Sequence, residues 1–386
     1  MGSQLRGVGM DRITEYKGIA GCTISCHARN PGKNFPTKSG RQGTEMFMRN
    51  CWYVAAWDDE IGGETPLGRT IVGEPVVLFR DSKGTVAALE DRCCHRHLPL
   101  SLGAVIGDNL QCGYHGLKFD ATGRCLEVPG QSQEPPDARV KSYPVVEKYH
   151  WVWIWMGDPA EADEVLIPDW WQADHPDWAS ARPDPLYVRC NYRLIGDNVL
   201  DVTHVNYVHG STIGSLSTHE FPVETEREDG LVRMSRWTYD RPPPPMYQKA
   251  GNFAGNVDRW QIVEHIPPCF SANEAGCAEV GKGHEEREKV GRMKLFAFSA
   301  PTPETERTTH YFFSFVRSFG HDDPELDVMF HDGLTNLFRE DVVILEAQQA
   351  MMDLKPGAAR IDINVDAAPL AARQMLDDMI TAEQSA

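Results

Sequence analysis

The chain between Trp52 and Trp155 is built from short apolar runs separated by turns. In TIVGEPVVLFRDSKGTVAALED, for example, Asp81–Gly84 separates two runs of strand length. The last run, WVWIW at 151–155, alternates tryptophan with smaller apolar residues, which packing in a core explains. The pattern predicts a small all-β domain in this part of the chain.

The pattern changes after Gly157, where the stretch DPAEADEVLIPDWW is acidic and interrupted by proline. Such a stretch indicates a junction between domains. Beyond it, helical stretches are predicted around 195–209 and 325–352, and the strand-like segments are LYVRCNYRL, LVRMSRWTY, KLFAFSA and HYFFSFV. Because these strands cluster instead of alternating regularly with helices, we predict an α+β domain.

Composition separates residues 1–45 from the rest of the chain. This segment carries seven Lys or Arg against three Asp or Glu, whereas the whole chain has 38 basic and 56 acidic residues. We interpret it as a flexible N-terminal extension. The remainder of a 386-residue chain accommodates two domains, which we place at 46–160 and 161–386.

The acidic balance excludes several classes of partner. A net charge of −18 disfavours nonspecific binding to nucleic acid or anionic membranes. No stretch reaches the ~18 apolar residues that cross a bilayer, and the N-terminus lacks the apolar core of a signal peptide. Ten cysteines in 386 residues do not resemble the disulfide framework of a small secreted domain. We therefore expect a cytoplasmic protein that binds neither membrane nor nucleic acid.

Two short pairs of metal ligands carry the first chemical signal: Cys93 with His95, then Cys112 with His115. Each pair supplies one sulfur and one nitrogen, as a Rieske [2Fe-2S] cluster with Cys on one iron and His on the other requires. A structural zinc site is the alternative, but zinc fingers favour a first pair of two cysteines. We favour the Rieske cluster. Cys94 is interpreted as a bystander, because adjacent side chains point apart.

A second signal lies in GDNVLDVTHVNYVHG, which contains Asp201, His204 and His209. Two imidazoles and one carboxylate hold non-haem Fe(II) and leave positions open. Capping and core packing of the two histidines are the alternative. On a straight helix five residues carry His209 ~140° away from His204, so both could not face one iron. We therefore predict a helix end or a π-bulge between them.

The third ligand stays open at this point. Asp197 and Asp201 are close by but are also suited to structural roles. The later predicted helix contains Asp341, beside an apolar stripe, together with Glu340 and Glu346. The residues alone do not rank these three carboxylates, and a solvated helix face would explain any one of them.

Taken together, the chain over residues 46–386 resembles the oxygenase component of Rieske non-haem iron oxygenases, in the branch of vanillate and dicamba O-demethylases. The motifs that carry the resemblance are NCWYVAAW, PLGRTI, LPLSLG, YHGLKFD, DNVLDVTHVNYVH and REDVVILEAQQ. The resemblance implies an N-terminal all-β Rieske domain. A catalytic domain with an antiparallel sheet and helices, of the helix-grip type, would follow it.

The resemblance also implies roles for single residues. Cys93 and Cys112 would bind one iron of the cluster and His95 and His115 the other, and the mononuclear iron would be bound by His204, His209 and Asp341. Asp201 would carry electrons between subunits, from His115 of one to His204 of the next, which implies a ring and usually a homotrimer. Two departures from the family stand beside the first motif: Cys94, where proline is usual, and His97, where glycine or another small residue is common.

The implied function is that of a terminal oxygenase. It would use O2 and electrons from NADH, delivered by a ferredoxin reductase and a ferredoxin, to hydroxylate a small aromatic substrate, with oxidative O- or N-dealkylation. An aromatic ring cis-dihydroxylating dioxygenase is the main alternative. A Rieske electron carrier without oxygenase activity is a more remote one, and a zinc-stabilised binding protein the remotest.

The substrate pocket is the part that the sequence defines least. Residues flanking the iron helix and a nearby strand are candidates: Ile195, Val199, Phe298 and Ser299. Core packing supplies similar residues at such positions. No basic residue stands out as one that must bind a carboxylate, so vanillate-like acids, dicamba-like herbicides and neutral anilides all stay open, with neutral or weakly polar aromatics slightly favoured.

Overall fold

The computed structural model describes residues 47–214, 220–287, 289 and 293–385. The predicted extension 1–45 lies outside the described residues. The following part is built from three small antiparallel sheets, as the short apolar runs predict. Their strands, in order across each sheet, are β1 (Trp52–Trp57), β11 (Trp151–Trp155) and β10 (Val145–Lys148); β2 (Leu67–Ile71), β3 (Glu74–Arg80), β4 (Val86–Glu90) and β9 (Ser142–Tyr143); and β5 (Ala104–Ile106), β6 (Asn109–Gln111), β7 (Lys118–Phe119) and β8 (Cys125–Glu127).

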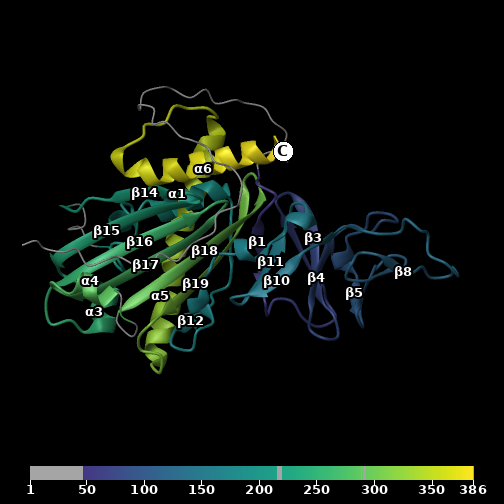
Figure 1. Cartoon of the computed structure of the whole chain (residues 1–386), viewed down its shortest axis with the longest axis horizontal. Coiled ribbons are helices and arrows are strands. Elements are labelled where there is room, and N and C mark those ends of the chain that lie inside the picture. The colour runs from purple at the N-terminus through teal and green to yellow at the C-terminus, as the bar shows by residue number, and fades with distance from the viewer. Residues whose placement is uncertain (1–46, 215–219, 288, 290–292, 386) are drawn as a thin grey trace, which may run out of the picture. The chain divides into compact units, whose positions relative to one another are not determined.

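One antiparallel sheet dominates the rest of the chain (Figure 1). Its strands, in spatial order, are β12 (Ala179–Ala181), β19 (Thr308–Arg317), β18 (Lys294–Thr305), β17 (Phe270–Glu279), β16 (Val257–Ile266), β15 (Leu231–Arg241) and β14 (Glu224–Glu228), and β13 (Leu186–Val188) also pairs with β19. The predicted α+β class is confirmed, with an antiparallel sheet and helices after the small β domain.

The helices of this part pack mainly on one face of the sheet. They are α1 (Tyr192–Leu200), α2 (Val205–Val208), α3 (Pro245–Gly251), α4 (Gly283–Arg287), α5 (Pro324–Leu354) and α6 (Ala367–Glu383). The described 3-10 turns of the whole chain are η1 (Leu100–Leu102), in the small β part, and then η2 (Pro159–Glu161), η3 (Glu164–Leu166), η4 (Trp171–Ala173) and η6 (Asn364–Asp366). The long helix α5 runs across the sheet, and α6 packs on α1 and β15 (Figure 1). Helix α5 matches the predicted stretch 325–352 closely, whereas the stretch predicted around 195–209 divides into α1 and α2.

Strand alternation gives the sheet two different faces. On one face, Leu295 and Phe313 pack with residues of α1 and α5. On the other, Phe298 stacks on Trp170 with 4.8 Å between ring centroids. Trp170 in turn meets the fully buried tryptophans of WVWIW, which confirms their place in a core. This second core is continuous across residue 160, so the boundary between the two domains stays a prediction.

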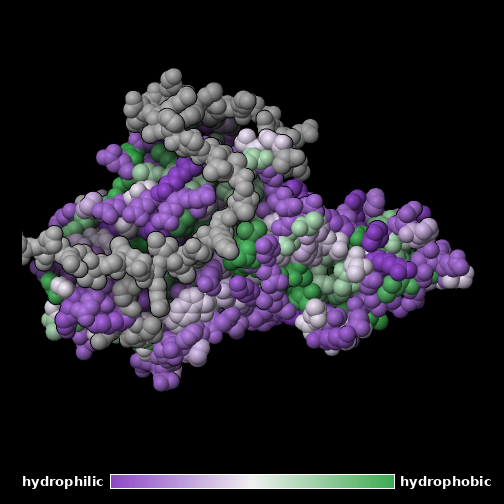
Figure 2. Space-filling model, viewed as in Figure 1, coloured by the Kyte–Doolittle hydropathy of each residue, from purple (hydrophilic) through white to green (hydrophobic). Residues whose placement is uncertain are grey.

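The described helices give no sign of a membrane segment. None of them combines the length and apolar character that spanning a bilayer requires. Outside the grey atoms, the face drawn in Figure 2 is covered mostly by hydrophilic residues.

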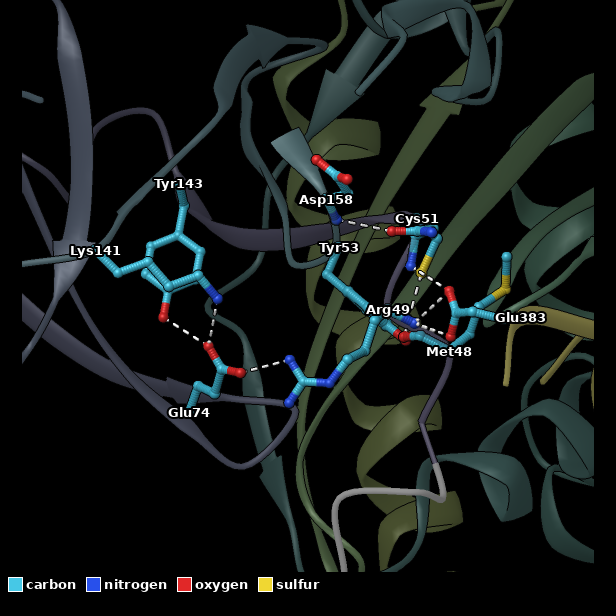
Figure 3. A network of polar contacts seen from close by, with 10 residues as sticks. Met48, Arg49, Cys51, Tyr53, Glu74, Lys141, Tyr143, Asp158 and Glu383 are labelled. Carbon is cyan, nitrogen blue, oxygen red and sulfur yellow. Dashed lines mark hydrogen bonds and ion pairs between the residues drawn. The ribbon is translucent and has the colours of Figure 1, made fainter. Parts of the chain in front are cut away.

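A polar network joins the C-terminal helix to the first described residues (Figure 3). The carboxylate of Glu383, at the end of α6, accepts the backbone N–H of Arg49 at 2.9 Å and that of Asn50. The Arg49 guanidinium in turn forms an ion pair with Glu74 of β3. Glu74 also accepts hydrogen bonds from Lys141 at 3.0 Å and from the Tyr143 hydroxyl at 2.7 Å. One carboxylate therefore gathers three donors from separate parts of the chain.

The Glu74 carboxylate is expected to stabilise the fold in a pH-dependent way. Burial raises the pKa of this carboxyl, but its three donors outweigh that effect and hold the pKa below its usual value of 4.5. A carboxyl with a lowered folded-state pKa contributes stability that is complete above the unfolded-state pKa and is lost as pH falls through the folded-state pKa. The variant Glu74→Gln should therefore lose about 0.5–1 kcal/mol of unfolding free energy at pH 7.

Urea denaturation followed by tryptophan fluorescence, repeated between pH 7 and pH 3.5, measures the difference. It should stay constant down to about pH 4.5 and shrink below that value. A difference that is equally large at every pH would contradict the ionic origin of the contribution.

Candidate metal centres

The two cysteine–histidine pairs lie on two loops that share one backbone pattern. The first loop follows β4, and the second connects β6 to β7. In each, the cysteine N–H donates to the carbonyl five residues later, and the cysteine carbonyl accepts from the N–H four residues later. The four bonds are Cys93 N to Leu98 O at 2.9 Å, His97 N to Cys93 O at 2.9 Å, Cys112 N to Leu117 O at 2.8 Å and Gly116 N to Cys112 O at 3.1 Å. Two equivalent loops are suited to clasp one cluster between them.

The side chains of the two loops converge as a Rieske cluster requires. The imidazoles of His95 and His115 lie edge to face, 4.5 Å apart between centroids, and both residues are exposed. Cys93 and Cys112 are each only 2% exposed. Burial raises the pKa of the Cys93 thiol to about 11, and the neighbouring Cys112 thiol adds to the effect. A bound metal reverses this preference, because a coordinating thiol is deprotonated. Two sulfurs and two nitrogens therefore fit the cluster, while Cys94 is exposed.

The structure explains the second departure from the family pattern. His97 has a φ of +60°, and Gly116, at the same position of the other loop, has a φ of +74°. This left-handed region favours glycine, and histidine is among the residues that enter it more often than most. The two loops thus require the same unusual backbone conformation, which His97 adopts with its side chain exposed.

The histidines of the second constellation flank a four-residue helix. Helix α1 ends at Leu200, and Asp201 caps it with φ −98° and ψ 93°. Helix α2 then begins after His204 and ends before His209, whose φ is −111°. The predicted helix end is confirmed, since no regular helix continues through His209. The change of direction brings both imidazoles to one side, with 5.3 Å between ring centroids.

Helix α5 supplies the third group. One candidate ligand atom from each of His204, His209 and Asp341 lies within 4.8 Å of the other two. Asp341 Oδ1 is 3.1 Å from His209 Nε2 and 3.5 Å from His204 Nε2. The side chain of His209 is fully buried, and its Nε2 atom forms no hydrogen bond. Two imidazoles and a carboxylate around a buried, unsatisfied nitrogen fit a mononuclear iron.

Neighbouring groups fix how the histidines point. His209 Nδ1 is 2.7 Å from Glu340 Oε2, and His204 Nδ1 bonds the backbone carbonyl of Asp201. Both Nδ1 atoms are therefore used as donors, which directs both Nε2 lone pairs to the metal position. Burial lowers the pKa of His209, but Asp341 and Glu340 outweigh that effect and raise it.

The carboxylates that the sequence left open now have separate places. Asp341 lies at the centre, and Glu340 supports His209 from the side. Glu346 accepts the backbone N–H of Arg189 at 2.9 Å. Asp197 forms a two-pronged ion pair with Arg373. Of the carboxylates considered at the sequence level, Asp341 is the one that the geometry favours as a ligand.

Asp201 stands beside this group and not within it. Its carboxylate accepts the backbone N–H of Thr203 at 2.8 Å, and the residue is half-buried. Its role as a bridge between subunits therefore stays a prediction. Asn198, one turn earlier, donates to Asp341 Oδ1 at 3.2 Å. No pattern in the sequence pointed to Asn198, because the contact depends on how α1 packs against α5.

The four pocket candidates divide between the two faces of the sheet and helix α1. Ile195 and Val199 lie on α1 in the core shared with α5. Ser299 faces the same side and donates to the Tyr311 hydroxyl at 3.0 Å. Phe298 points to the opposite face, where it stacks on Trp170. This corrects the expectation for Phe298, since adjacent residues of a strand face opposite ways.

Comparison with known proteins agrees with both centres. Residues 51–144 match the Rieske [2Fe-2S] domain, and residues 188–382 match the vanillate O-demethylase oxygenase C-terminal domain. The chain belongs to the Rieske non-haem iron oxygenases. Within that family it falls in the branch of the vanillate and dicamba O-demethylases. This oxygenase therefore uses a Rieske [2Fe-2S] cluster and a mononuclear non-haem iron.

Similar proteins cover almost the whole described chain of this oxygenase. It is 42% identical over 342 residues to the iron-sulfur subunit of the toluene-4-sulfonate monooxygenase system of Comamonas testosteroni, covering 88% of this chain and 98% of the relative. It is 39% identical over 347 residues to a vanillate O-demethylase oxygenase subunit of a Pseudomonas species, covering 88% and 97%. The crystal structure of dicamba monooxygenase bound to 3,6-dichlorosalicylic acid is similar with a TM-score of 0.83 and 33% identity, covering 88% of this chain and 100% of that one.

The contact between Glu340 and His209 is expected to support iron binding. In Glu340→Ala the imidazole loses the carboxylate that fixes its tautomer, so Fe(II) affinity should fall roughly 10–100-fold. Anaerobic Fe(II) titration of the apoprotein measures the dissociation constant. Glu346→Ala, on the same helix, is the matched control and should leave the affinity close to that of the parent. An equal loss in both variants would refute the specific role of Glu340.

Proposed function

We propose that this chain is the terminal oxygenase of a Rieske monooxygenase system and removes an O- or N-alkyl group from an aromatic substrate. The observation that carries the proposal is the convergence of His204, His209 and Asp341. These three residues would hold a mononuclear iron, and three protein ligands would leave positions for dioxygen and substrate. Relatives named as vanillate and dicamba O-demethylases and as a chloroacetanilide N-alkylformylase support dealkylation. Hydroxylation of the alkyl carbon gives an unstable hemiacetal or hemiaminal, which releases an aldehyde.

The chain's own residues supply positioning and enclosure. When bound, the cluster and the iron supply one-electron transfer and the activation of dioxygen. Glu340 and the Asp201 carbonyl hold the two imidazoles in the tautomer that binds metal. Tyr311, Phe313 and Phe338 form a buried aromatic group on the same side of the sheet, which excludes water from that side.

Electrons are proposed to cross between subunits through Asp201. The exposed His115 is available to another copy of the chain, and the half-buried Asp201 lies three residues before His204. A contact from His115 of one subunit to Asp201 of the next is head-to-tail, and such contacts close into a ring by rotation. This supports a homotrimer. The exposed cluster histidines also fit electron delivery by a ferredoxin, itself reduced by an NADH-dependent reductase.

The variant Asp201→Asn should keep both metal centres but slow electron transfer. Turnover is expected to fall about 10–100-fold, because the amide cannot replace the bridging carboxylate. Iron content and the visible spectrum of the cluster check assembly, and steady-state rates check turnover. The control is Asp197→Asn, in the helix α1 that Asp201 caps. This variant removes the ion pair with Arg373 of α6 and should turn over near the parent rate. Normal turnover in Asp201→Asn would refute the bridge.

Product analysis separates dealkylation from the main alternative. With a panel of alkyl aryl ethers and N-alkyl anilides, supplied with a surrogate ferredoxin and reductase, we expect formaldehyde or another aldehyde in step with oxygen consumption. A ring dioxygenase would instead release a cis-diol. Detection of cis-diol alone would overturn the proposed reaction.

Metal content separates an oxygenase from a plain electron carrier. The assembled protein should contain about three irons and about two acid-labile sulfides per chain, because two irons belong to the cluster. His204→Ala should retain the sulfide and lose about one iron. About two irons in both proteins would support a carrier and contradict the proposed function.

A further inference from the structure

Two arginine side chains are buried on the face of the sheet that the triad shares. Arg236 of β15 and Arg259 of β16 are each only 4% exposed. Arg236 pairs with Gln261 across the strands, and Arg259 pairs with Thr238. The two arginines are thus diagonal neighbours on adjacent strands, close enough for long side chains to meet.

Neither arginine has a carboxylate partner among the described residues. Arg236 donates from Nη1 to the Val202 carbonyl at 3.4 Å, and Arg259 donates from Nη1 to the Ile213 carbonyl at 3.0 Å. The Arg259 guanidinium also lies over the Tyr247 ring at 5.2 Å. Nε of both arginines and Nη2 of Arg259 form no hydrogen bond.

A third buried arginine, in contrast, has a carboxylate partner. Arg317 is equally buried, but its Nη2 is 2.7 Å from Asp327 Oδ1. An unpaired buried cation is strongly unfavourable, whereas an ion-paired one is tolerated. Burial and the nearby charge of Arg259 lower the pKa of Arg236, with Asp201 partly opposing them. The pair therefore concentrates positive charge that the described residues leave largely uncompensated.

The two arginines contact the backbone on either side of the iron ligands His204 and His209. Val202 precedes His204 by two residues, a span of at most ~7 Å. Ile213 follows His209 by four residues, a span of at most ~14 Å. Each carbonyl contact uses one of the five N–H donors of a guanidinium. The remaining donors lie on the triad side of the sheet.

We propose that Arg236 and Arg259 bind an oxyanion substituent, a carboxylate or a sulfonate, on the aromatic substrate. The inference rests on the proposed function and narrows its substrate class. The paired N–H donors of a guanidinium match two oxygens of a carboxylate or a sulfonate, and such charge-assisted bonds are strong in a buried site. A neutral aromatic would leave both cations desolvated and unpaired. The structure thus favours acids over the neutral substrates that the sequence slightly favoured.

Binding to the iron-loaded protein, measured by calorimetry, tests the charge preference without turnover. The probes are 4-methylbenzenesulfonate and 4-methylbenzoate, compared with the neutral 4-methylbenzenesulfonamide and 4-methylbenzamide. At least one anion should bind roughly 10–100-fold more tightly than its amide. The tighter of the two anions identifies the preferred substituent. Equal affinity within both pairs overturns the proposal.

Substitutions assign the preference to the two arginines. In Arg236→Met and Arg259→Met the anion should bind roughly tenfold or more weakly, while the amides change little. Removing an unpaired buried cation should leave the Tm unchanged or raise it. The lysine variants retain the charge and should fall between parent and methionine variants. Equal loss of anion and amide binding, with a lower Tm, would show a purely structural role and overturn the proposal.

A matched control lies on the same strand. Arg233 is three residues before Arg236, faces the opposite side of β15 and pairs with Glu264 at 2.9 Å. Arg233→Met removes the same charge from the chain without touching the proposed site. It should leave anion binding near that of the parent. A loss as large as that in Arg236→Met would indicate a nonspecific charge effect and contradict the proposal.

Proximity to the iron provides a further readout. The 19F signal of bound 4-(trifluoromethyl)benzenesulfonate should be broadened by the iron in the parent and much less in His204→Ala. Equal line widths in the two proteins would place the anion elsewhere and overturn the proposal.

Failure of the proposed function gives a different result from failure of this inference. If only the proposed function fails, the protein still binds anions more tightly than amides, but no probe or alkyl aryl ether gives an oxygen-dependent product. If only the inference fails, alkyl aryl ethers give an oxygen-dependent product, but the protein binds anions no more tightly than amides.

Discussion

The position of His209 is the constraint on which the catalytic centre depends. Its imidazole is fully buried and lies between two adjacent carboxylates of α5, with Nε2 at 3.1 Å from Asp341 and Nδ1 at 2.7 Å from Glu340. Burial alone would lower the pKa of this imidazole, and the two carboxylates outweigh that effect and raise it. Asp341 lies at the proposed metal position, and the adjacent Glu340 orients the His209 imidazole. The contact therefore joins α2 to a helix more than a hundred residues later in the chain.

The sequence predicted the parts of both centres that are local. The spacing of Cys93, His95, Cys112 and His115 predicted a shared site, and two short loops with the same backbone pattern carry these residues. The helix end near His209 followed from the angle between positions on a helix. The choice of Asp341 did not follow from such reasoning. It depends on how α5 packs against α2, and only the resemblance to a family selected it beforehand.

Strand residues were harder to place, because alternation defines two faces but does not say which one is buried. In LVRMSRWTY, Arg233 and Arg236 look alike in the sequence. Being three apart, they face opposite ways: Arg233 meets Glu264 on the outer side, while Arg236 is 4% exposed on the side of the triad. The same alternation places Phe298 and Ser299, which are adjacent in the sequence, on opposite faces of the sheet. Which face helices cover is a tertiary property, and it decides which of these residues can take part in the site.

The overall charge sharpens the meaning of the buried arginines. A chain with a net charge of −18 repels anions, but at physiological ionic strength this repulsion is screened beyond about 8 Å. Recognition of an anion must then come from direct hydrogen bonds and ion pairs in the protein interior, where the low dielectric strengthens electrostatic interactions. Two cations that lack partners also act against neutral molecules, which would leave them desolvated. Arg236 and Arg259 would therefore select substrates by what they reject as much as by what they bind.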